Sequence, residues 1–462
     1  MSQKNMVIVS NYSYEQDNYS LLGPQMAATI IEDNSDYECN VLAIGRDFDK
    51  KLAKVCIEKL LDGSQPIVGF SHLAERSDLY NLARELKEEG AVTILGGPQS
   101  DVNYVGEIGW QQYDHRFHGL ADAFTFAIHG PAEQLVPFLN SDSGDYQDFN
   151  GFLYAKNGEY KVNPESKWNE ARLRRVRWDN LYGIGSDAPE SIKVTNVQVL
   201  YQLGCPYAAK KTRIGIDYPT NIHNKPFGKT GSITIDTCGC SFCDVARDKG
   251  LGIRMPVDAV LEQIANVPEN EDGKKVPFEL INENPFLVLR ELLLGIKDRG
   301  IDISQVNLVT RADWLIKGED KLRDALGLAE DMGIRFLMSG VGFESFADSI
   351  LRNLNKGYTV ATNIAAVKLM RKLKEQYPDN FLYSPSDGAI HGFIHPTPWD
   401  TGDTKREMYR NIAIYGLDGD VLPSTSIPLI IHHACWLADW TRELESKENI
   451  KLNRDGSLIE WW

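Results

Sequence analysis

Apolar and polar residues in the first part of the chain follow each other in the order of strand, loop and helix. The short apolar run MVIVS at Met6–Ser10 predicts a buried strand, and the segment 21–33 behind a polar loop predicts a helix. An amphipathic helix is expected over 76–90, and further strands are expected at 39–45, 66–71, 91–99 and 122–134. This alternation predicts an α/β fold with a doubly wound, Rossmann-like parallel sheet over residues 1–145.

A second series of strands and helices starts near residue 193. Candidate strands lie at 194–202, 232–237, 277–282, 306–313, 334–342 and 389–397, and helices are expected at 286–300, 319–333 and 361–376. Repeated strand–helix units predict a full or partial (β/α) barrel of the TIM type over 193–400, with its site at the carboxyl ends of the strands. Residues 146–192 have hairpin character and form a connector, and residues 401–462 form a C-terminal extension.

Small residues follow several of the predicted strands of the first domain. Ser71, Gly96, Gly97 and Gly130 each come at a strand's carboxyl end, where ligands bind in doubly wound sheets. Glycine there lets the backbone approach a large flat ligand. The alternative is that these glycines only form tight turns.

Composition narrows the class of protein. The 462 residues are 42% hydrophobic and 25% charged, which is typical of a globular protein with more than one domain. No apolar run approaches the roughly 20 residues of a membrane helix, and the start lacks a signal-peptide pattern, so we expect a cytoplasmic protein without membrane contact. The net charge of −16 argues against nucleic-acid binding, which needs a basic surface.

Cysteine is concentrated in one short segment. Cys238, Cys240 and Cys243 lie within TCGCSFCDV, and such crowding in a reducing compartment indicates metal binding or redox chemistry. A structural zinc site needs a second Cys or His pair, which is missing at ligand spacing. Three thiolates on an iron–sulfur cluster with one open iron fit the number better, while zinc and structural thiols remain alternatives.

The segments LGCPY at Leu203–Tyr207 and CSFCDV at Cys240–Val245 resemble the two halves of the radical S-adenosylmethionine (SAM) signature. Downstream, PFELINENP, VNLVTRADWL, GFESFADSILRNLNKGYT and GFIHPTPWDTGDT resemble later strands of that family's barrel. The pieces NYSLLGPQMAATI, VGFS, ILGGPQ and HGPAEQ resemble the cobalamin-binding domain that precedes the barrel in one subclass. The chain is thus similar to the cobalamin-dependent radical SAM enzymes over most of its length.

The resemblance implies a 4Fe–4S cluster, SAM and cobalamin as cofactors, and it leaves the third cluster ligand open. In the usual motif the first two cysteines are close together, but here residues 206–239 lie between Cys205 and Cys240. The ligands are then Cys205, Cys240 and Cys243, or Cys238 replaces Cys205. The inserted segment is basic in an acidic chain, with Lys210, Lys211, Arg213, Lys225 and Lys229.

Roles for other residues follow from the same resemblance. Phe242 would pack by the adenine, Arg311 would hold the methionyl carboxylate unless it only pairs with Asp313, and Glu283 would meet the methionyl amino group. Glu344 would contact the ribose or cobalamin. The residues implied to contact the corrin and its nucleotide tail are Ser71, Gly96, Gly97, Gly130 and Glu133. The Asp-x-His-x-x-Gly pattern that supplies a histidine to cobalt is missing, since His72, His115, His118 and His129 do not sit in it.

The implied activity is C-methylation, in which a 5′-deoxyadenosyl radical removes hydrogen from an unactivated carbon and methylcobalamin donates the methyl group. One candidate substrate is a protein or peptide side chain, because relatives methylate glutamine or arginine in methyl-coenzyme M reductase. A flavodoxin- or ferredoxin-type protein is the expected reductant. The alternatives are a cobalamin-dependent cyclisation or rearrangement, and a non-catalytic iron–sulfur or zinc protein.

Overall fold

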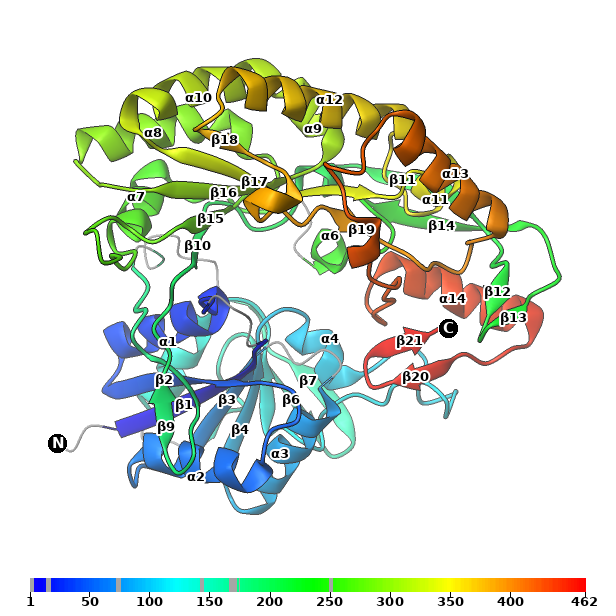
Figure 1. Ribbon diagram of the computed structural model, residues 1–462. Coiled ribbons are helices and arrows are strands. Elements are labelled where there is room, and N and C mark those ends of the chain that lie inside the picture. The colour runs from blue at the N-terminus through cyan, green and yellow to red at the C-terminus, as the bar shows by residue number, and fades with distance from the viewer. Residues whose placement is uncertain are drawn as a thin grey trace. The chain divides into compact units, whose positions relative to one another are not determined.

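The computed structural model describes residues 4–13, 18–71, 76–141, 145–165, 173, 175–248 and 252–462 (Figure 1). The chain forms two compact units. The first comprises Met1–Gln198, Ala265–Pro268 and Arg454–Ser457, and the second comprises Val199–Ile264, Glu269–Asn453 and Leu458–Trp462. Both contain parallel strands and helices, so the mixed α/β class is confirmed. Within the described ranges, no helix is both long and apolar enough to cross a membrane.

The first unit is built on a nine-stranded sheet of order β7-β6-β5-β4-β3-β1-β2-β8-β9. Its strands are β1 Lys4–Asn11, β2 Tyr37–Ile44, β3 Ile67–Ser71, β4 Val92–Gly96, β5 Phe126–Ile128, β6 Phe152–Lys156, β7 Glu159–Val162, β8 Leu181–Ile184 and β9 Pro189–Ser191. Strands β5, β4, β3, β1 and β2 are parallel. The chain reverses its direction of travel across the sheet between β1 and β3, and open parallel sheets bind ligands at such a point.

Alternate residues of the strands face opposite sides of this sheet. Val7 and Val9 of β1 join a core with α2 Lys50–Leu61 and α3 Ser77–Glu88. Met6 and Ile8 point to the other side, where they line a cavity. The remaining helical segments of the unit are α1 Leu22–Asn34, α4 Ser100–Val105, η1 Ala132–Leu135 and α5 Val136–Leu139.

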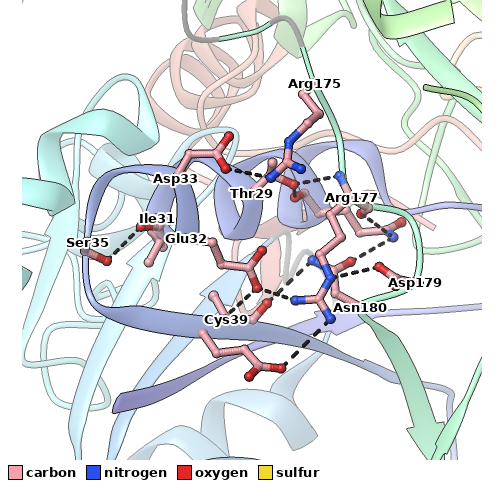
Figure 2. Close-up of polar contacts among 12 residues, drawn as sticks. Thr29, Ile31, Glu32, Asp33, Ser35, Cys39, Arg175, Arg177, Asp179 and Asn180 are labelled. Atoms are coloured by element: carbon pink, nitrogen blue, oxygen red, sulfur yellow. Dashed lines mark hydrogen bonds and ion pairs between the residues drawn. The ribbon is translucent and has the colours of Figure 1, made fainter. Parts of the chain in front are cut away.

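The segment before β8 is fastened along α1 by charged and polar contacts (Figure 2). Arg175 pairs with Asp33 at 2.6 Å, and Arg177 pairs with Glu32. The backbone N–H of Arg177 also donates to the Thr29 hydroxyl at 2.8 Å. These contacts hold the segment that leads into β8 against α1, within the first unit. The hairpin expected in the connector forms as β6 and β7.

The second unit contains an open sheet of order β10-β15-β16-β17-β18, with β19 also paired to β17. Its strands are β10 Val197–Leu200, β15 Phe278–Ile281, β16 Gln305–Thr310, β17 Arg335–Glu344, β18 Phe381–Leu382 and β19 Gly392–Phe393. Helices on one side of the sheet include α8 Leu289–Asp298, α10 Glu319–Met332 and α12 Val360–Gln376 (Figure 1). Further helices are α7 Val257–Ala265, α9 Ala312–Lys317 and α11 Asp348–Asn353. The described strands do not close into a barrel.

One predicted barrel strand belongs elsewhere. The segment 232–237 does form a strand, β14 Ser232–Cys238, but it pairs antiparallel with β11 Lys211–Asp217 in a separate two-stranded sheet. The loop of this hairpin contains the small pair β12 Asn221–Ile222 and β13 Lys225–Pro226. Expecting it in the barrel was wrong, because alternating burial identifies a strand but not the strand it pairs with.

The C-terminal extension packs against one face of the β11–β14 hairpin. Helix α14, Trp436–Glu448, places Trp440 in a core with Ile233 and Ile235 of β14. The other C-terminal elements are α13 Gly402–Ile414, η6 Pro423–Thr425, β20 Asn453–Asp455 and β21 Leu458–Glu460. The short helix α6, Asp244–Asp248, follows the CxxC segment. The inner face of the hairpin is therefore covered by the C-terminal extension.

The first unit contains a buried ion pair between Arg454 and Glu107. Arg454 donates from Nε and Nη2 to the two carboxylate oxygens of Glu107, each at 2.9 Å. The side chains are 5% and 0% exposed. Removing one partner of such a pair is costly because it leaves a charge in a poorly solvated place.

We therefore expect Arg454→Met to lower the free energy of unfolding by about 3–5 kcal/mol. Urea denaturation monitored by circular dichroism measures the change. The double variant Arg454→Met/Glu107→Gln should recover part of the loss, since it also removes the buried negative charge. Equal stability of the wild type and Arg454→Met would contradict the account of this pair.

Candidate functional site

The hairpin β11–β14 closes the long insertion between the two halves of the cysteine motif. Its register pairs Lys211 with Cys238, so the chain leaves and re-enters at the same place. Cys205 precedes β11 by the short turn η3, Pro206–Ala209, and Cys240 follows β14 by two residues. Burial, together with the Glu283 carboxylate and the Cys240 sulfur, raises the pKa of Cys205 to about 11. The two thiols therefore lie within electrostatic reach of each other.

Cys238 lies on the other face of the hairpin from the buried residues. Along β14, Ile233, Ile235 and Thr237 are buried, whereas Asp236 is exposed and pairs with Lys211 at 3.1 Å. Because successive side chains of a strand point to opposite faces, Cys238 shares the outward face with Asp236. The structure thus brings Cys205, rather than Cys238, toward the CxxC segment.

The CxxC loop is fixed through Ser241, whose side chain is fully buried. Its N–H donates to the Leu354 carbonyl at 3.0 Å, and its hydroxyl donates to the Asn353 carbonyl at 2.9 Å. Its own carbonyl accepts from the N–H of Leu437 in the first turn of α14, also at 3.0 Å. Within the loop, the Cys243 N–H donates to the Cys240 carbonyl at 3.3 Å. The cysteines are therefore held by α11 on one side and the C-terminal helix on the other.

Asn355 joins the two halves of the motif. The Tyr207 hydroxyl donates to the Asn355 carbonyl at 3.0 Å, and the Asn355 side-chain amide donates to the Gly239 carbonyl at 2.7 Å. Gly357 adopts φ +73°, and a Cβ at this position would collide with the Tyr207 hydroxyl. Only glycine lets the ring of Tyr207 lie there.

Arg311 lies directly beside the cysteines and is 5% exposed. It follows β16, and its Nη1 donates to the Cys240 sulfur at 3.3 Å. Its Nε donates to Asp313 at 3.0 Å, so the ion pair weighed as the alternative role does form. Its guanidinium lies over the Tyr207 ring at 3.8 Å.

A second buried cation, Lys356, lies near the same sulfur. It is 3% exposed and pairs with Glu344 at 3.1 Å. Burial alone would lower the pKa of Lys356, but the carboxylate of Glu344 and the Cys240 sulfur outweigh burial and raise it. Glu344 itself has a left-handed φ of 61°, and strained backbone of this kind concentrates at functional sites.

The remaining predicted residues of this unit surround the cations. The Phe242 ring lies 6.0 Å from Lys356 Nζ and also packs against the core of α14, so its core-filling role is realised. Burial raises the pKa of Glu283, while Lys356 and Arg311 partly oppose the rise. Thr310 of β16 donates to the Glu283 carbonyl at 3.2 Å and fixes its backbone. Over the described residues, no group of three or more His, Cys, Asp or Glu side chains is arranged to hold a single metal ion.

The first unit holds a separate cavity of about 370 Å³ at the carboxyl ends of β1, β3 and β4. Four of the residues predicted from the sequence line it, namely Ser71, Gly96, Gly97 and Gly130. Most other lining residues are apolar, among them Met6, Ile8, Phe70, Ile94 and Leu135. Glu133 lies in η1, whose Ala132 and Leu135 line the cavity while Glu133 does not. The cavity therefore suits a flat, largely apolar group approached by backbone.

The described histidines of the first unit each contact different partners. His129 next to Gly130 has its two ring nitrogens at 3.0 Å from Asp101 and 3.4 Å from Glu165. The ring of His118 contacts the Asp114 carbonyl, and the ring of His115 lies against Tyr113. His72 lies outside the described residues.

Sequence reasoning missed Ser241, Asn355, Lys356 and Tyr358. Burial raises the pKa of Tyr358 to about 12, and its ring lies 5.6 Å from Lys356 Nζ. The only sequence signal for these residues was their position within two segments that carry the family resemblance, CSFC and LNKGYT. Neither a scan against models of protein families nor a search of curated proteins found a match to this chain.

The raised pKa of Glu283 predicts a pH dependence of stability. The unfolded chain releases this proton near the ordinary value of 4.5, whereas the folded chain keeps it to higher pH. Between these two values the folded state binds more protons, so Glu283 costs stability as the pH rises through that window.

We therefore expect Glu283→Gln to gain stability over the wild type as the pH rises from 4 to 7. Urea midpoints measured at both pH values test this. The exposed Glu291→Gln on α8 is the control and should show no such gain. A difference in urea midpoint between Glu283→Gln and the wild type that stays constant with pH would refute the raised pKa of Glu283.

Proposed function

We propose that this chain is a cobalamin-dependent radical SAM enzyme, most simply a C-methyltransferase. The observation that carries the proposal is the pairing of β11 with β14, which returns the chain so that Cys205 and the CxxC loop lie together. The finer architecture we propose is a cobalamin-binding doubly wound domain followed by a partial radical SAM barrel. The sequence resemblance supplies the class, and the geometry supports it.

The donor set suits an iron–sulfur cluster better than a single ion. Thiolates on one cluster bind different irons and stand further apart than ligands on one zinc, and the described residues form no single-ion group. Cys205, Cys240 and Cys243 would hold the cluster. When bound, it would supply the electron that cleaves SAM to the 5′-deoxyadenosyl radical.

The buried cations of the site have a matching use. Arg311 and Lys356 place two positive charges beside Cys240, each with one carboxylate partner, Asp313 or Glu344. This arrangement offsets the negative charge of a thiolate-bound cluster and attracts the methionyl carboxylate. Glu283, whose carboxylate acts on the Cys205 thiol, would accept from the methionyl amino group, and Phe242 would offer its ring to the adenine.

The cavity of the first unit would hold the nucleotide tail of cobalamin. It lies at the point where the chain reverses across the sheet, and it is lined by Gly96, Gly97 and Gly130. A Cβ on Gly96 would meet only the Phe70 carbonyl at 3.9 Å, so there is room beside this glycine for a bulky group. Bound there, the cofactor would supply the methyl group. Ser71 would offer a hydroxyl.

The methyl-transfer step and its substrate rest on the resemblance alone. A protein or peptide side chain is the candidate substrate, and a flavodoxin- or ferredoxin-type protein of the cytoplasm is the candidate reductant. A product heavier by one methyl group distinguishes this reaction from a cyclisation or rearrangement.

The cysteine assignment gives the first prediction. Anaerobic reconstitution with iron and sulfide should give about four irons per chain. Reduction by dithionite with SAM should then give 5′-deoxyadenosine. Cys205→Ala should lose both, because one cluster ligand is removed, whereas Cys238→Ala should keep both. The opposite pattern would assign the ligand to Cys238, and zinc without SAM cleavage in the wild type would refute the proposed function.

The cavity gives the second prediction. A Cβ on Gly96 would meet only the Phe70 carbonyl at 3.9 Å, so a larger side chain is tolerated by the fold but occupies the cavity. A clash of about 1–3 kcal/mol between the added side chain and the bound group should weaken hydroxocobalamin binding by Gly96→Leu by roughly 5- to 150-fold. Equilibrium dialysis with the visible spectrum measures this. The control Gly327→Leu lies on α10 with open space around it, so it should bind hydroxocobalamin like the wild type. Equal hydroxocobalamin binding by the two variants would exclude the cavity as the cobalamin site.

A further inference from the structure

We infer that Arg311 acts on the proposed cluster through the Cys240 sulfur, as a positioning residue that sets the cluster's reduction potential, and does not hold the methionyl carboxylate. The inference rests on the proposed function. It also changes the role that the resemblance implies for this residue.

The nitrogens of Arg311 are already engaged in three directions. Nε donates to Asp313 at 3.0 Å, Nη1 donates to Cys240 Sγ at 3.3 Å, and Nη2 donates to the Lys356 carbonyl. A guanidinium binds a carboxylate through two parallel N–H groups on one edge. With Nε bound to Asp313, the edge that includes Nε is occupied, and only two of the five N–H groups of Arg311 remain for a further ligand.

Aromatic rings hold the guanidinium in this position. Its carbon lies 3.8 Å from the centroid of Tyr207, 5.2 Å from Tyr358 and 5.3 Å from Trp314. The Tyr207 ring is held by the hydrogen bond from its hydroxyl to the Asn355 carbonyl, and it occupies the space beside Gly357 where a Cβ would otherwise lie. With 5% exposure, the group has little freedom to turn toward a ligand.

The contact with sulfur has a defined electrostatic effect. A hydrogen bond to a cluster thiolate, together with a nearby positive charge, favours the more negative, reduced state. Arg311 should therefore raise the potential at which the cluster accepts its electron. Lys356, which pairs with Glu344 at 3.1 Å, is the second buried cation beside the same sulfur.

The test measures potential and SAM binding separately. Reconstituted wild type and Arg311→Gln are titrated anaerobically with dithionite and redox mediators, and the reduced cluster is followed by electron paramagnetic resonance. SAM affinity is measured by equilibrium dialysis with radiolabelled SAM. We expect Arg311→Gln to have a more negative midpoint potential and the wild-type affinity for SAM. The control Arg323→Gln, on α10 and paired with Glu319, should change neither.

A second variant keeps the inference testable if Arg311→Gln takes up no iron. Asp313→Asn leaves Arg311 in place but removes its counter-charge, so the midpoint potential should shift in the opposite, positive direction. A purely structural role for Arg311 predicts no such opposed shift. Unchanged potentials in Asp313→Asn, or unchanged potential with lost SAM binding in Arg311→Gln, would overturn the inference. A wild type that binds no iron would instead refute the proposed function.

Discussion

The antiparallel pairing of β11 with β14 is the constraint on which the candidate site depends. Chain closure over an insertion of this length adds only a small entropic cost, because that cost grows slowly with loop length. The paired backbone fixes Lys211 opposite Cys238, and α14 covers the inner face with Trp440. Cys205 and Cys240 consequently lie together although they are distant in sequence. Without this register, the cysteine motif would be two unrelated fragments.

Buried charge determines what that site can do. Arg311 and Lys356 are nearly without solvent contact, and each is compensated by one carboxylate and by the sulfur of Cys240. Burying a cation costs free energy unless it is paired, so a protein that only needed a stable fold would gain little from these two residues. They are useful beside a thiolate-bound group of negative charge. The segment from Asn353 onward supplies both Lys356 and the carbonyls that hold Ser241.

Much of this organisation could be predicted from the sequence, and the failures have physical reasons. The expected helix 21–33 forms as α1 over Leu22–Asn34, and small residues at strand ends do line one cavity, because both follow from local periodicity. The strand at 232–237 was assigned to the wrong sheet, since its pattern carries no information on its partner. Lys356 was not predicted as a site residue because lysine side chains are usually exposed, and its burial depends on the tertiary fold. The Arg311 contact with Cys240 depends on packing by Tyr207, which no spacing rule reveals.

The central claim is that three cysteines hold a cluster with one iron left open for SAM. Electron paramagnetic resonance of the reconstituted, dithionite-reduced wild type, recorded with and without SAM, tests it most directly. The account predicts the signal of a reduced 4Fe–4S cluster whose g values change when SAM is added, because SAM binds the open iron. A cluster signal that SAM leaves unchanged, or no iron signal at all, would contradict it.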